Sequence, residues 1–478
     1  MNGPLVVLGD ALLDIDLVGR ADRLCPEAAA PVLEDVTERA RPGGAALAAL
    51  LAAADGHEVV LVTPLADDEP GRRLRRLIED RMQVVSLPGG GPTSVKRRIL
   101  AAGHQLARLD AGGTGSGVQE LPADLDALLQ RAGAVLVADY GRGITADPNV
   151  RELLSRAGQT RPLIWDPHPR GAAPVPSARV VTPNQGEAAL FAGRLPGSLG
   201  SPTSPVAAAA GHADALLRAW GAGAVAVTMG ARGALLSYGC GAPALMPAPP
   251  LARVDTCGAG DRFAAAVAGG LGNGLLLAEA IQYGVAAASG FLAAGGVATL
   301  DNLFPNHGSG TASGDLLTTG ALSSAADGVA LATAVRRRGG VVVATGGCFD
   351  LLHAGHVATL LDARAMGDCL IVCLNSDDSV RRQKGPQRPL VPEDDRARVL
   401  LALECVDAVV IFGEDTPERV LDVLRPDIWV KGGDYVGTDL PEAKVLASWG
   451  GQAVVLPYLP GRSTTRLVHS AAAANLTD

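Results

Sequence analysis

The chain has 478 residues, a formal net charge of −9 and an apolar share of 48%. This composition argues against a disordered chain, and the acidic balance argues against a nucleic-acid partner, which needs a basic face. The seven scattered cysteines form no Cys-x-x-Cys pair, which is typical of buried thiols in a cytoplasmic protein. We expect neither a signal peptide nor a membrane partner, because Asp10 and Asp14 interrupt the first apolar run and no basic segment precedes it.

Short apolar runs alternate with helical stretches over residues 1–303. Ala-, Leu- and Arg-rich segments separate these runs, which have the length and composition of buried strands. The runs lie at 5–9, 59–63, 134–139, 163–166, 180–184 and 224–230. The alternation predicts an α/β domain with a doubly wound, mostly parallel sheet, which binds ligands at the carboxyl ends of its strands.

A second and smaller α/β domain is predicted over residues 339–478. It follows a linker at 304–338, which is rich in Gly, Ser, Thr and Ala up to residue 327 and helical after that. Strand-like runs then recur at 341–345, 370–374, 408–412, 428–431 and 453–457. These five runs predict a second doubly wound, mostly parallel sheet in a Rossmann-like domain.

A glycine-rich turn, DTCGAGDRF (255–263), stands before an alanine-rich helix. The N–H groups of Gly258, Ala259 and Gly260 would lie at the positive end of that helix, which suits a phosphoryl group. Asp261 is placed to accept a proton from an attacking hydroxyl. For this segment alone, a plain turn with a capping aspartate is the alternative. The whole string resembles the signature of the ribokinase-like (PfkB) carbohydrate kinases.

Other segments resemble that family in the same order along the chain. GDALLD (9–14) resembles its sugar-binding strand, RPGGAA (41–46) its substrate loop, TPNQGEA (182–188) its Asn-x-x-Glu motif, and VTMGARGA (227–234) its turn beside the adenine nucleotide. The resemblance implies sugar contacts from Asp14, Gly43, Gly44 and more weakly Asp10, ATP contacts from Asn184, Glu187 and Gly230, and an indirect Mg²⁺ contact from Glu187. Any one of these fragments alone is better explained as a turn or a helix cap. Together with the turn at 255–263 they make five matches in the order of the family, which coincidence does not explain.

Three further segments, at 25–31, 93–110 and 137–143, resemble the branch of the family that phosphorylates heptose 7-phosphate. A sugar that already carries a phosphate needs cationic partners, and strand alternation places Lys96 and Arg98 on one face. We predict that Lys96, Arg98 and Arg108 bind this sugar. Solvated charges on an edge strand are an equal alternative for each of them.

The second domain opens with TGGCFDLLHAGH (345–356), directly after a predicted strand. His353 and His356 share one face at a helix start, where they can donate to phosphate oxygens as negative charge builds. Gly355 lets a nucleotide approach the backbone closely. A zinc pair and ordinary helix histidines are the alternatives. The string resembles the His-x-Gly-His signature of the cytidylyltransferase-like nucleotidyltransferases, which implies nucleotide contacts from Thr345 and Phe349 as well.

Three later segments resemble the same family. Lys384 lies in a Gly/Pro-containing basic segment that resembles the loop meeting the triphosphate, and Lys431 precedes a Gly-Gly turn at a strand end. GRSTTRLV (461–468) resembles a helix start whose hydroxyl and N–H groups bind phosphate. This implies ATP contacts from Ser463, Thr464 and Thr465, with a plain helix cap as the alternative.

Together the two halves resemble the family of bifunctional heptose 7-phosphate kinase/heptose 1-phosphate adenylyltransferases. The resemblance implies ATP as a substrate of both domains, Mg²⁺ as a cofactor, a separate phosphatase acting between the two steps, and a homodimer paired through a lid sheet. All of these steps use small-molecule substrates.

Four positions depart from the family patterns. Leu47 replaces an Asn that meets a sugar hydroxyl, His168 and Arg142 replace lysines, and Gly346 replaces an Asn. Arg170 is a candidate substitute for the lysine missing at position 168. The departures keep two alternatives open, namely the same chemistries on another sugar phosphate or with CTP, and a non-catalytic sensor of sugar phosphates or nucleotides.

Overall fold

The computed structural model describes residues 3–28, 30–89, 91–101, 104–113, 118, 120–196, 202–251, 255–302, 325–433 and 440–457. Within these ranges the chain forms two compact units. Unit 1 takes residues from Met1–Arg194, Leu216–Thr228 and Pro249–Pro305, and unit 2 takes residues from Leu195–Ala215, Met229–Ala248 and Asn306–Asp478. The domain boundaries at 303 and 339 stay a prediction. No helix in the described ranges has both the length and the apolar character needed to cross a bilayer.

The main sheet of unit 1 is parallel throughout, as predicted. Its strand order is β11-β10-β9-β8-β1-β4-β5. Every residue of β1 and β8 is buried because helices cover both faces of the sheet. The strands are β1 (Leu5–Gly9), β4 (Val59–Pro64), β5 (Gln83–Leu87), β8 (Ala134–Ala138), β9 (Leu163–Asp166), β10 (Val180–Val181) and β11 (Val225–Thr228).

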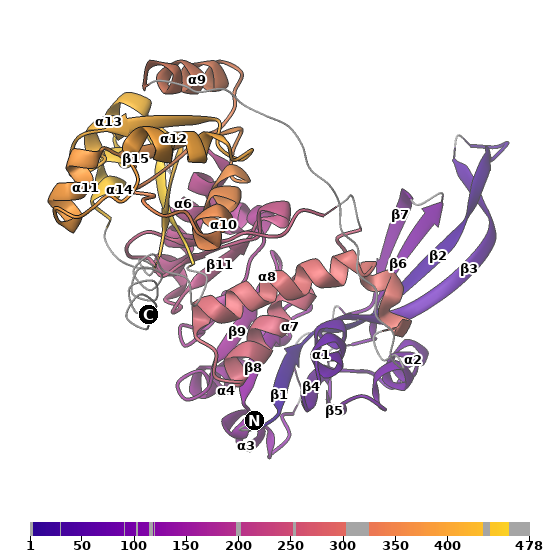
Figure 1. Ribbon diagram of the computed structural model, residues 1–478. Helices are drawn as coiled ribbons and strands as arrows, with labels where there is room; N and C mark the ends of the chain where they lie inside the picture. Colours follow the sequence, from indigo (N-terminus) through magenta and orange to yellow (C-terminus); the bar gives the residue numbers. More distant parts are fainter. Residues whose placement is uncertain are drawn as a thin grey trace, which may run out of the picture. The chain divides into compact units, whose positions relative to one another are not determined.

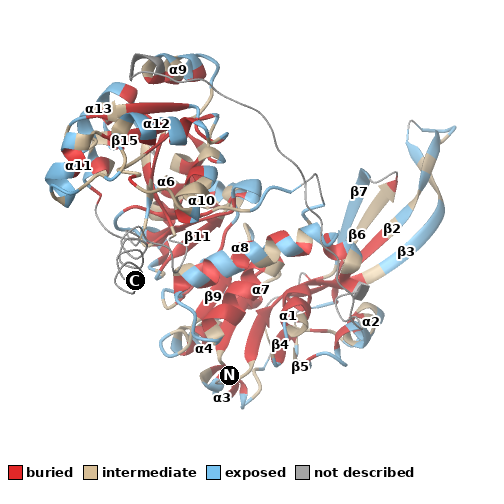
Figure 2. Ribbon diagram, viewed as in Figure 1, coloured by how far each residue is buried: buried red, intermediate tan, exposed pale blue. Residues whose placement is uncertain are grey.

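A second sheet of unit 1, the lid sheet, has the order β3-β2-β6-β7. Its strands are β2 (Ala11–Leu24), β3 (Pro31–Gly44), β6 (Ser94–Ala101) and β7 (His104–Ala111). The long β2 and β3 run out from the main sheet as a two-stranded ribbon (Figure 1). They are buried where they meet the rest of the unit and exposed farther out (Figure 2).

The helices of unit 1 surround the main sheet. Among them, α7 is buried along most of its length and packs against α1, α8 and β8 (Figure 2). The helices are α1 (Ala45–Ala54), α2 (Glu69–Ile78), α3 (Leu125–Arg131), α4 (Pro148–Ala157), α5 (Gln185–Ala192), α7 (Ala259–Gly272) and α8 (Leu277–Ala293). Helix α6 spans Pro205–Trp220.

Unit 2 contains a five-stranded parallel arrangement in the order β16-β15-β14-β17-β18. These strands are β14 (Val342–Gly347), β15 (Cys369–Asn375), β16 (Ala408–Phe412), β17 (Ile428–Gly432) and β18 (Gln452–Leu456), and each overlaps a predicted run. The unit also holds an antiparallel pair, β12 (Ala234–Ser237) and β13 (Ala244–Met246). Its helices are α9 (Ala325–Arg337), α10 (Ala354–Arg364), α11 (Asp377–Lys384), α12 (Glu393–Leu401), α13 (Glu418–Leu424) and α14 (Pro441–Ala447).

Candidate active sites

The glycine turn before α7 has the geometry of an anion site. Gly258 is the N-cap residue and has a φ of 79°, which favours glycine. A Cβ at Gly258 would lie 2.9 Å from Val297 Cγ1 and 3.2 Å from Leu47 Cδ2. The N–H of Ala259 donates to the carbonyl of Thr256, whereas a Cβ at Gly260 would have open space around it. The first amides of a helix lack intrahelical acceptors, so this turn can cradle a phosphoryl group.

Asp261 lies in the first turn of α7 and is only 8% exposed. Burial raises the pKa of its carboxyl to about 7. The hydroxyl of Tyr140, which follows β8, donates to Asp261 Oδ1 over 2.5 Å. A buried carboxylate with a pKa near neutrality suits a general base. Sequence reasoning missed Tyr140, although its segment VADYGRG carried part of the family resemblance.

Asp166 and Glu187 form an acidic region near this base. Burial and the charges of Asp261 and Glu187 raise the pKa of Asp166, whose Oδ1 accepts a hydrogen bond of 2.8 Å from Thr182 Oγ1. Burial also raises the pKa of Glu187. A nearby divalent cation would relieve this repulsion, and Mg²⁺ prefers one or two carboxylates together with water and substrate phosphates. The donor set therefore fits Mg²⁺, although the described residues hold no group of three side chains able to bind a metal alone.

The Asn-x-x-Glu motif forms a reciprocal cap at the start of α5. Asn184 Oδ1 accepts from the N–H of Glu187, and Glu187 Oε2 accepts from the N–H of Asn184, both over 2.9 Å. The cap that the sequence offered as an alternative is therefore present. It does not exclude the predicted role, because Glu187 Oε1 is not part of the box.

A row of charges crosses the lid sheet at Asp14. This residue of β2 is opposite Arg41 of β3 and Lys96 of β6 in the strand register. Asp14 is 2% exposed, and its oxygens lie 3.2 Å from Lys96 Nζ and 3.6 Å from Arg41 Nη2. A Cβ at Gly43 would lie 2.6 Å from Asp14 Cγ, which accounts for glycine there, and Gly44 is the N-cap residue of α1. The predicted sugar residues Asp14, Gly43, Gly44 and Lys96 therefore come together.

Arg98 and Arg108 are already paired with carboxylates. Arg98 donates to both oxygens of Asp16 over 2.8 and 2.9 Å, and Arg108 donates to both oxygens of Asp110 over 2.8 and 2.6 Å. Arg41, which sequence reasoning missed, is 9% exposed and also donates to Asp16. Its Nε and Nη2 have no hydrogen-bond partner among the described residues. Its only sequence signal was its place at the head of RPGGAA.

Three departures from the family pattern lie around the same site. Leu47 is 2% exposed and faces Gly258, so it packs in the apolar interior. The pKa of His168 is lowered to about 4, first by burial and then by the charges of Arg170, Arg142 and Arg108. His168 is therefore neutral at pH 7, and the positive charge in this region comes from the arginines.

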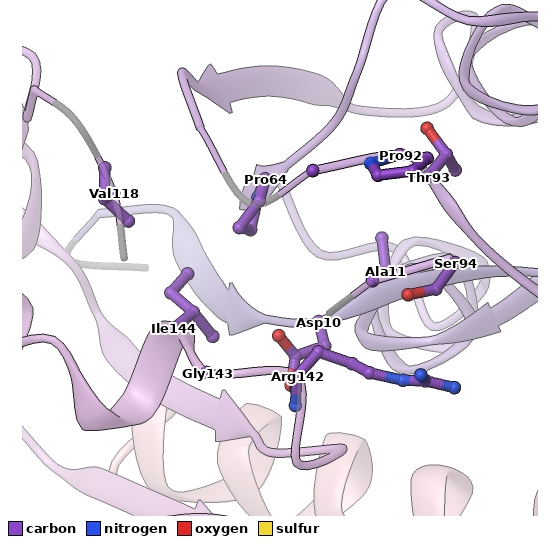
Figure 3. A pocket seen from close by; sticks show the side chains of 12 residues that line it. Asp10, Ala11, Pro64, Pro92, Thr93, Ser94, Val118, Arg142, Gly143 and Ile144 are labelled. Atoms are coloured by element: carbon purple, nitrogen blue, oxygen red, sulfur yellow. The ribbon is translucent and has the colours of Figure 1, made fainter. Parts of the chain in front are cut away.

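A cavity of about 30 Å³ opens beside Asp10 and Arg142 (Figure 3). This volume has room for a single small polar group or a water molecule, and not for a whole sugar. Asp10 Oδ2 accepts the backbone N–H groups of Tyr140 and Arg142, each over 3.0 Å. The first function of Asp10 is thus to fix the loop after β8. The cavity is also lined by Thr93 and Ser94 at the start of β6.

The second candidate site lies where β14 leads into α10. His353 caps this helix and accepts the N–H of Gly355 over 3.1 Å at Nδ1. The rings of His353 and His356 stack with centroids 3.9 Å apart. Burial, followed by the charges of His353 and Lys384, lowers the pKa of His356 to about 4. His356 Nδ1 is buried and has no hydrogen-bond partner in the described part of the chain. His356 is therefore a neutral imidazole at pH 7, and Lys384 supplies positive charge nearby.

Phe349, Thr345 and Gly346 shape the floor of this site. Phe349 has a φ of 43°, and its ring centroid lies 5.3 Å from that of His356. Thr345 Oγ1 donates to the carbonyl of Val430 over 2.8 Å, so its hydroxyl ties β14 to β17. A Cβ at Gly346 would lie 2.5 Å from the ring of Trp429, which explains why an Asn does not fit there.

Two cations of unit 2 fix neighbouring segments of the chain. Lys431 Nζ lies 2.7 Å from Glu442 Oε1, so the predicted lysine is paired. Sequence reasoning missed Arg396, whose side chain is 1% exposed and donates to the carbonyls of Cys348 and Asn375. Nothing in its charged segment distinguished it from a surface arginine.

Two predictions concern other parts of the chain. Ser463, Thr464 and Thr465 lie outside the described residues. Gly230 begins a short 3-10 turn with a φ of 60°, and a Cβ there would meet nothing within 4 Å. The glycine is thus explained by its backbone conformation, and its predicted nucleotide contact stays a prediction.

Comparisons with known proteins agree with this two-part organisation. The family model described as pfkB family carbohydrate kinase matches residues 3–302, and the model described as Cytidylyltransferase-like matches residues 344–466. A ribokinase of Arabidopsis thaliana, solved with ribose and ATP, is 24% identical with a TM-score of 0.47, over 61% of this chain and 93% of its own.

Two curated relatives are similar over nearly their whole length. The bifunctional protein HldE of Streptomyces coelicolor is 54% identical, over 98% of this chain and 96% of its own. The bifunctional protein HldE of Azorhizobium caulinodans is 36% identical, over 98% of both chains. Because these relatives and both family models match, the chain belongs to the family of bifunctional HldE proteins, which joins a PfkB carbohydrate kinase to a cytidylyltransferase-like part.

Proposed function

We propose that this chain catalyses two ATP-dependent steps in the synthesis of ADP-heptose. The first phosphorylates O1 of D-glycero-β-D-manno-heptose 7-phosphate, and the second joins heptose 1-phosphate to the adenylyl group of ATP. The observation that carries the proposal is the presence of two separate candidate sites in one family member, a buried base beside a helix N-terminus and a stacked histidine pair at another.

In the kinase step, Asp261 takes the proton of the O1 hydroxyl while that oxygen bonds to the γ-phosphorus. The bond from this phosphorus to ADP breaks, and ADP leaves. The amides around Gly258 and Gly260 hold the transferring group, which carries its charge on oxygens. Asp14, Gly43 and Lys96 bind the sugar. Asp166, and Glu187 indirectly, would hold Mg²⁺, which would supply positive charge against the phosphates of ATP.

In the adenylyl step, a phosphate oxygen of heptose 1-phosphate attacks the α-phosphorus of ATP, and pyrophosphate leaves. No covalent enzyme intermediate is needed, so the residues act by positioning and by stabilising charge. His353 and His356 donate to the phosphate oxygens, and Lys384 and Lys431 neutralise the triphosphate. Thr345, Phe349 and Gly355 shape the nucleotide side, and Ser463, Thr464 and Thr465 add phosphate contacts.

The surrounding pathway follows from this chemistry. A separate phosphatase removes the 7-phosphate between the two steps, because neither proposed site hydrolyses a phosphate ester. The enzyme works in the cytoplasm, where ATP is available, and pairs as a homodimer through its lid sheet. No observation favours CTP, another sugar phosphate or a non-catalytic sensor over this assignment.

The test is product analysis with purified substrates. Heptose 7-phosphate and ATP should give heptose bisphosphate and ADP, and addition of a sugar-bisphosphate phosphatase should then give ADP-heptose and pyrophosphate. Replacement of ATP by CTP in the second reaction measures the choice of nucleotide. Absence of the bisphosphate in the first reaction, or of ADP-heptose in the second, contradicts the proposal.

A further inference from the structure

We propose that Tyr140 is a positioning residue for the kinase step, and that its hydroxyl holds the carboxylate of Asp261 ready to accept the proton of the sugar hydroxyl. The inference rests on the proposed function, because it takes Asp261 as the base. It assigns a role to a residue for which the family resemblance supplied none.

The geometry gives the two oxygens of Asp261 different tasks. Tyr140 lies two residues beyond the end of β8 and Asp261 lies in the first turn of α7, and these two elements pack together. The 2.5 Å hydrogen bond from the phenol reaches Oδ1 alone. This bond fixes the rotation of the carboxylate and leaves Oδ2 for the substrate hydroxyl.

A hydrogen bond also fixes the backbone at Tyr140. Asp10 Oδ2 accepts the N–H of Tyr140 over 3.0 Å, and the carbonyl of Asp10 accepts the N–H of Ala45 at the start of α1 over 3.1 Å. Asp10 itself is 4% exposed. Because the backbone and side chain of Asp10 tie α1 and the loop after β8 to the end of β1, the phenol has little freedom to move away from Asp261.

The charges that face Asp261 explain why such a donor is needed. Burial is the largest influence on its pKa and raises it, and Asp14 of β2 acts in the same direction. The charge of Asp261 in turn raises the pKa of Asp166, the last residue of β9. Tyr140 exerts the largest opposing influence, ahead of Lys96 of β6. Without the phenol, the carboxyl would therefore hold its proton more tightly and be a base in a smaller share of molecules.

Tyr140 donates a hydrogen bond without giving up its proton. Its pKa is raised well above 10 by burial and by the charges of Asp261 and Asp166. In the reaction, the O1 proton passes to Asp261 Oδ2 while the bond from O1 to the γ-phosphorus forms and the bond to ADP breaks. Tyr140 keeps its proton throughout and stabilises the ionised carboxylate before the step.

The test is the pH dependence of the kinase step in Tyr140→Phe. A hydrogen bond to a charged group contributes enough to shift a pKa by roughly one to two units, so the acid limb of kcat/KM should move to higher pH by that amount. Tyr283→Phe is the matched control, because Tyr283 is 42% exposed on α8. Its acid limb should stay where the native enzyme has it. The adenylyl step of both variants should match the native enzyme.

A second variant keeps the test decisive if Tyr140→Phe does not fold. Site-specific replacement of Tyr140 by 3-fluorotyrosine makes the phenol a stronger donor and should move the acid limb to lower pH. An acid limb that stays at the native position in either folded variant overturns the inference while the proposed function stands. A native chain with no kinase turnover overturns both, so the two failures are distinguishable.

Discussion

Burial sets the pH at which Asp261 can work. The base accepts a proton only when it is ionised, and burial raises the pKa of its carboxyl to about 7. Kinase kcat/KM should therefore rise with pH through the neutral range and level off above a pH of about 7. Initial rates of ADP formation across this range measure the effect. A kinase rate that is flat from mildly acidic to neutral pH would contradict the role of Asp261.

Asp14 is the buried carboxylate between two cations of the lid sheet. Its side chain is 3% exposed beside Lys96, and Arg41 lies on its other side. Removal of one partner from a buried ion pair costs about 3–5 kcal/mol, so Asp14→Asn should lower the free energy of unfolding by about 3 kcal/mol. Denaturant unfolding measures this difference.

Asp110→Asn is the matched control for this prediction. It breaks the pair with Arg108 in which the two side chains are 49% and 33% exposed. A partly exposed pair contributes about 1 kcal/mol or less, so this variant should stay close to the native stability. Equal losses of unfolding free energy in both variants would show that the buried charges around Asp14 stabilise the fold no more than the partly exposed pair does.

Individual candidate residues could be predicted where a short sequence motif contains them. Asp261, His353 and His356 follow from short strings next to a helix start, because their chemistry needs only local backbone around them. Tyr140 and Arg41 could not be assigned in this way. Their partners lie far away in the sequence, at Asp261 for Tyr140 and at Asp16 for Arg41, and only packing brings them together.

The turn before α7 requires glycine at position 258, because the backbone there has a positive φ. Gly258→Ala places a Cβ at a φ of 79°, 2.9 Å from Val297 Cγ1. The turn must shift, and loss of an aligned anion-stabilising donor costs about 100-fold or more in rate. Kinase kcat should therefore fall by about 100-fold, while the adenylyl rate is unchanged.

Gly274→Ala separates backbone strain from the loss of the anion site. Gly274 has a similar φ of 89°, but a Cβ there would meet nothing within 4 Å. This variant should lose about 1–2 kcal/mol of stability and keep native kinase activity. A Gly258→Ala enzyme with native kinase rates would show that the turn does not hold the phosphoryl group.

Elements were predictable where burial shapes their composition. Apart from the edge strand β5, which was not predicted, the strands of both parallel sheets read as apolar runs because helices cover both of their faces. The ribbon of β2 and β3 was not predicted as two long strands, because its outer half is exposed and carries charged residues in place of an apolar pattern. The cap of α5 shows a different limit. The Asn-x-x-Glu motif at Asn184 and Glu187 forms a helix cap and also supplies a proposed metal contact. The sequence alone does not distinguish these two roles.

At the scale of the whole molecule, the two candidate sites are built from different residues. The kinase residues around Asp261 lie in unit 1, and the histidine pair lies in unit 2. Tyr140, Asp14 and Lys96 beside Asp261 all belong to unit 1, and Phe349 and Lys384 beside the histidines belong to unit 2. The account therefore predicts that the two activities can be removed one at a time.

The most direct test is product identification by mass spectrometry with two separate variants. Asp261→Ala should make no heptose bisphosphate from heptose 7-phosphate, yet still convert heptose 1-phosphate and ATP to ADP-heptose. His356→Ala should do the reverse. Loss of both products in a folded variant, or survival of the kinase product in Asp261→Ala at the native rate, would contradict the claim that one chain houses two independent ATP-dependent sites.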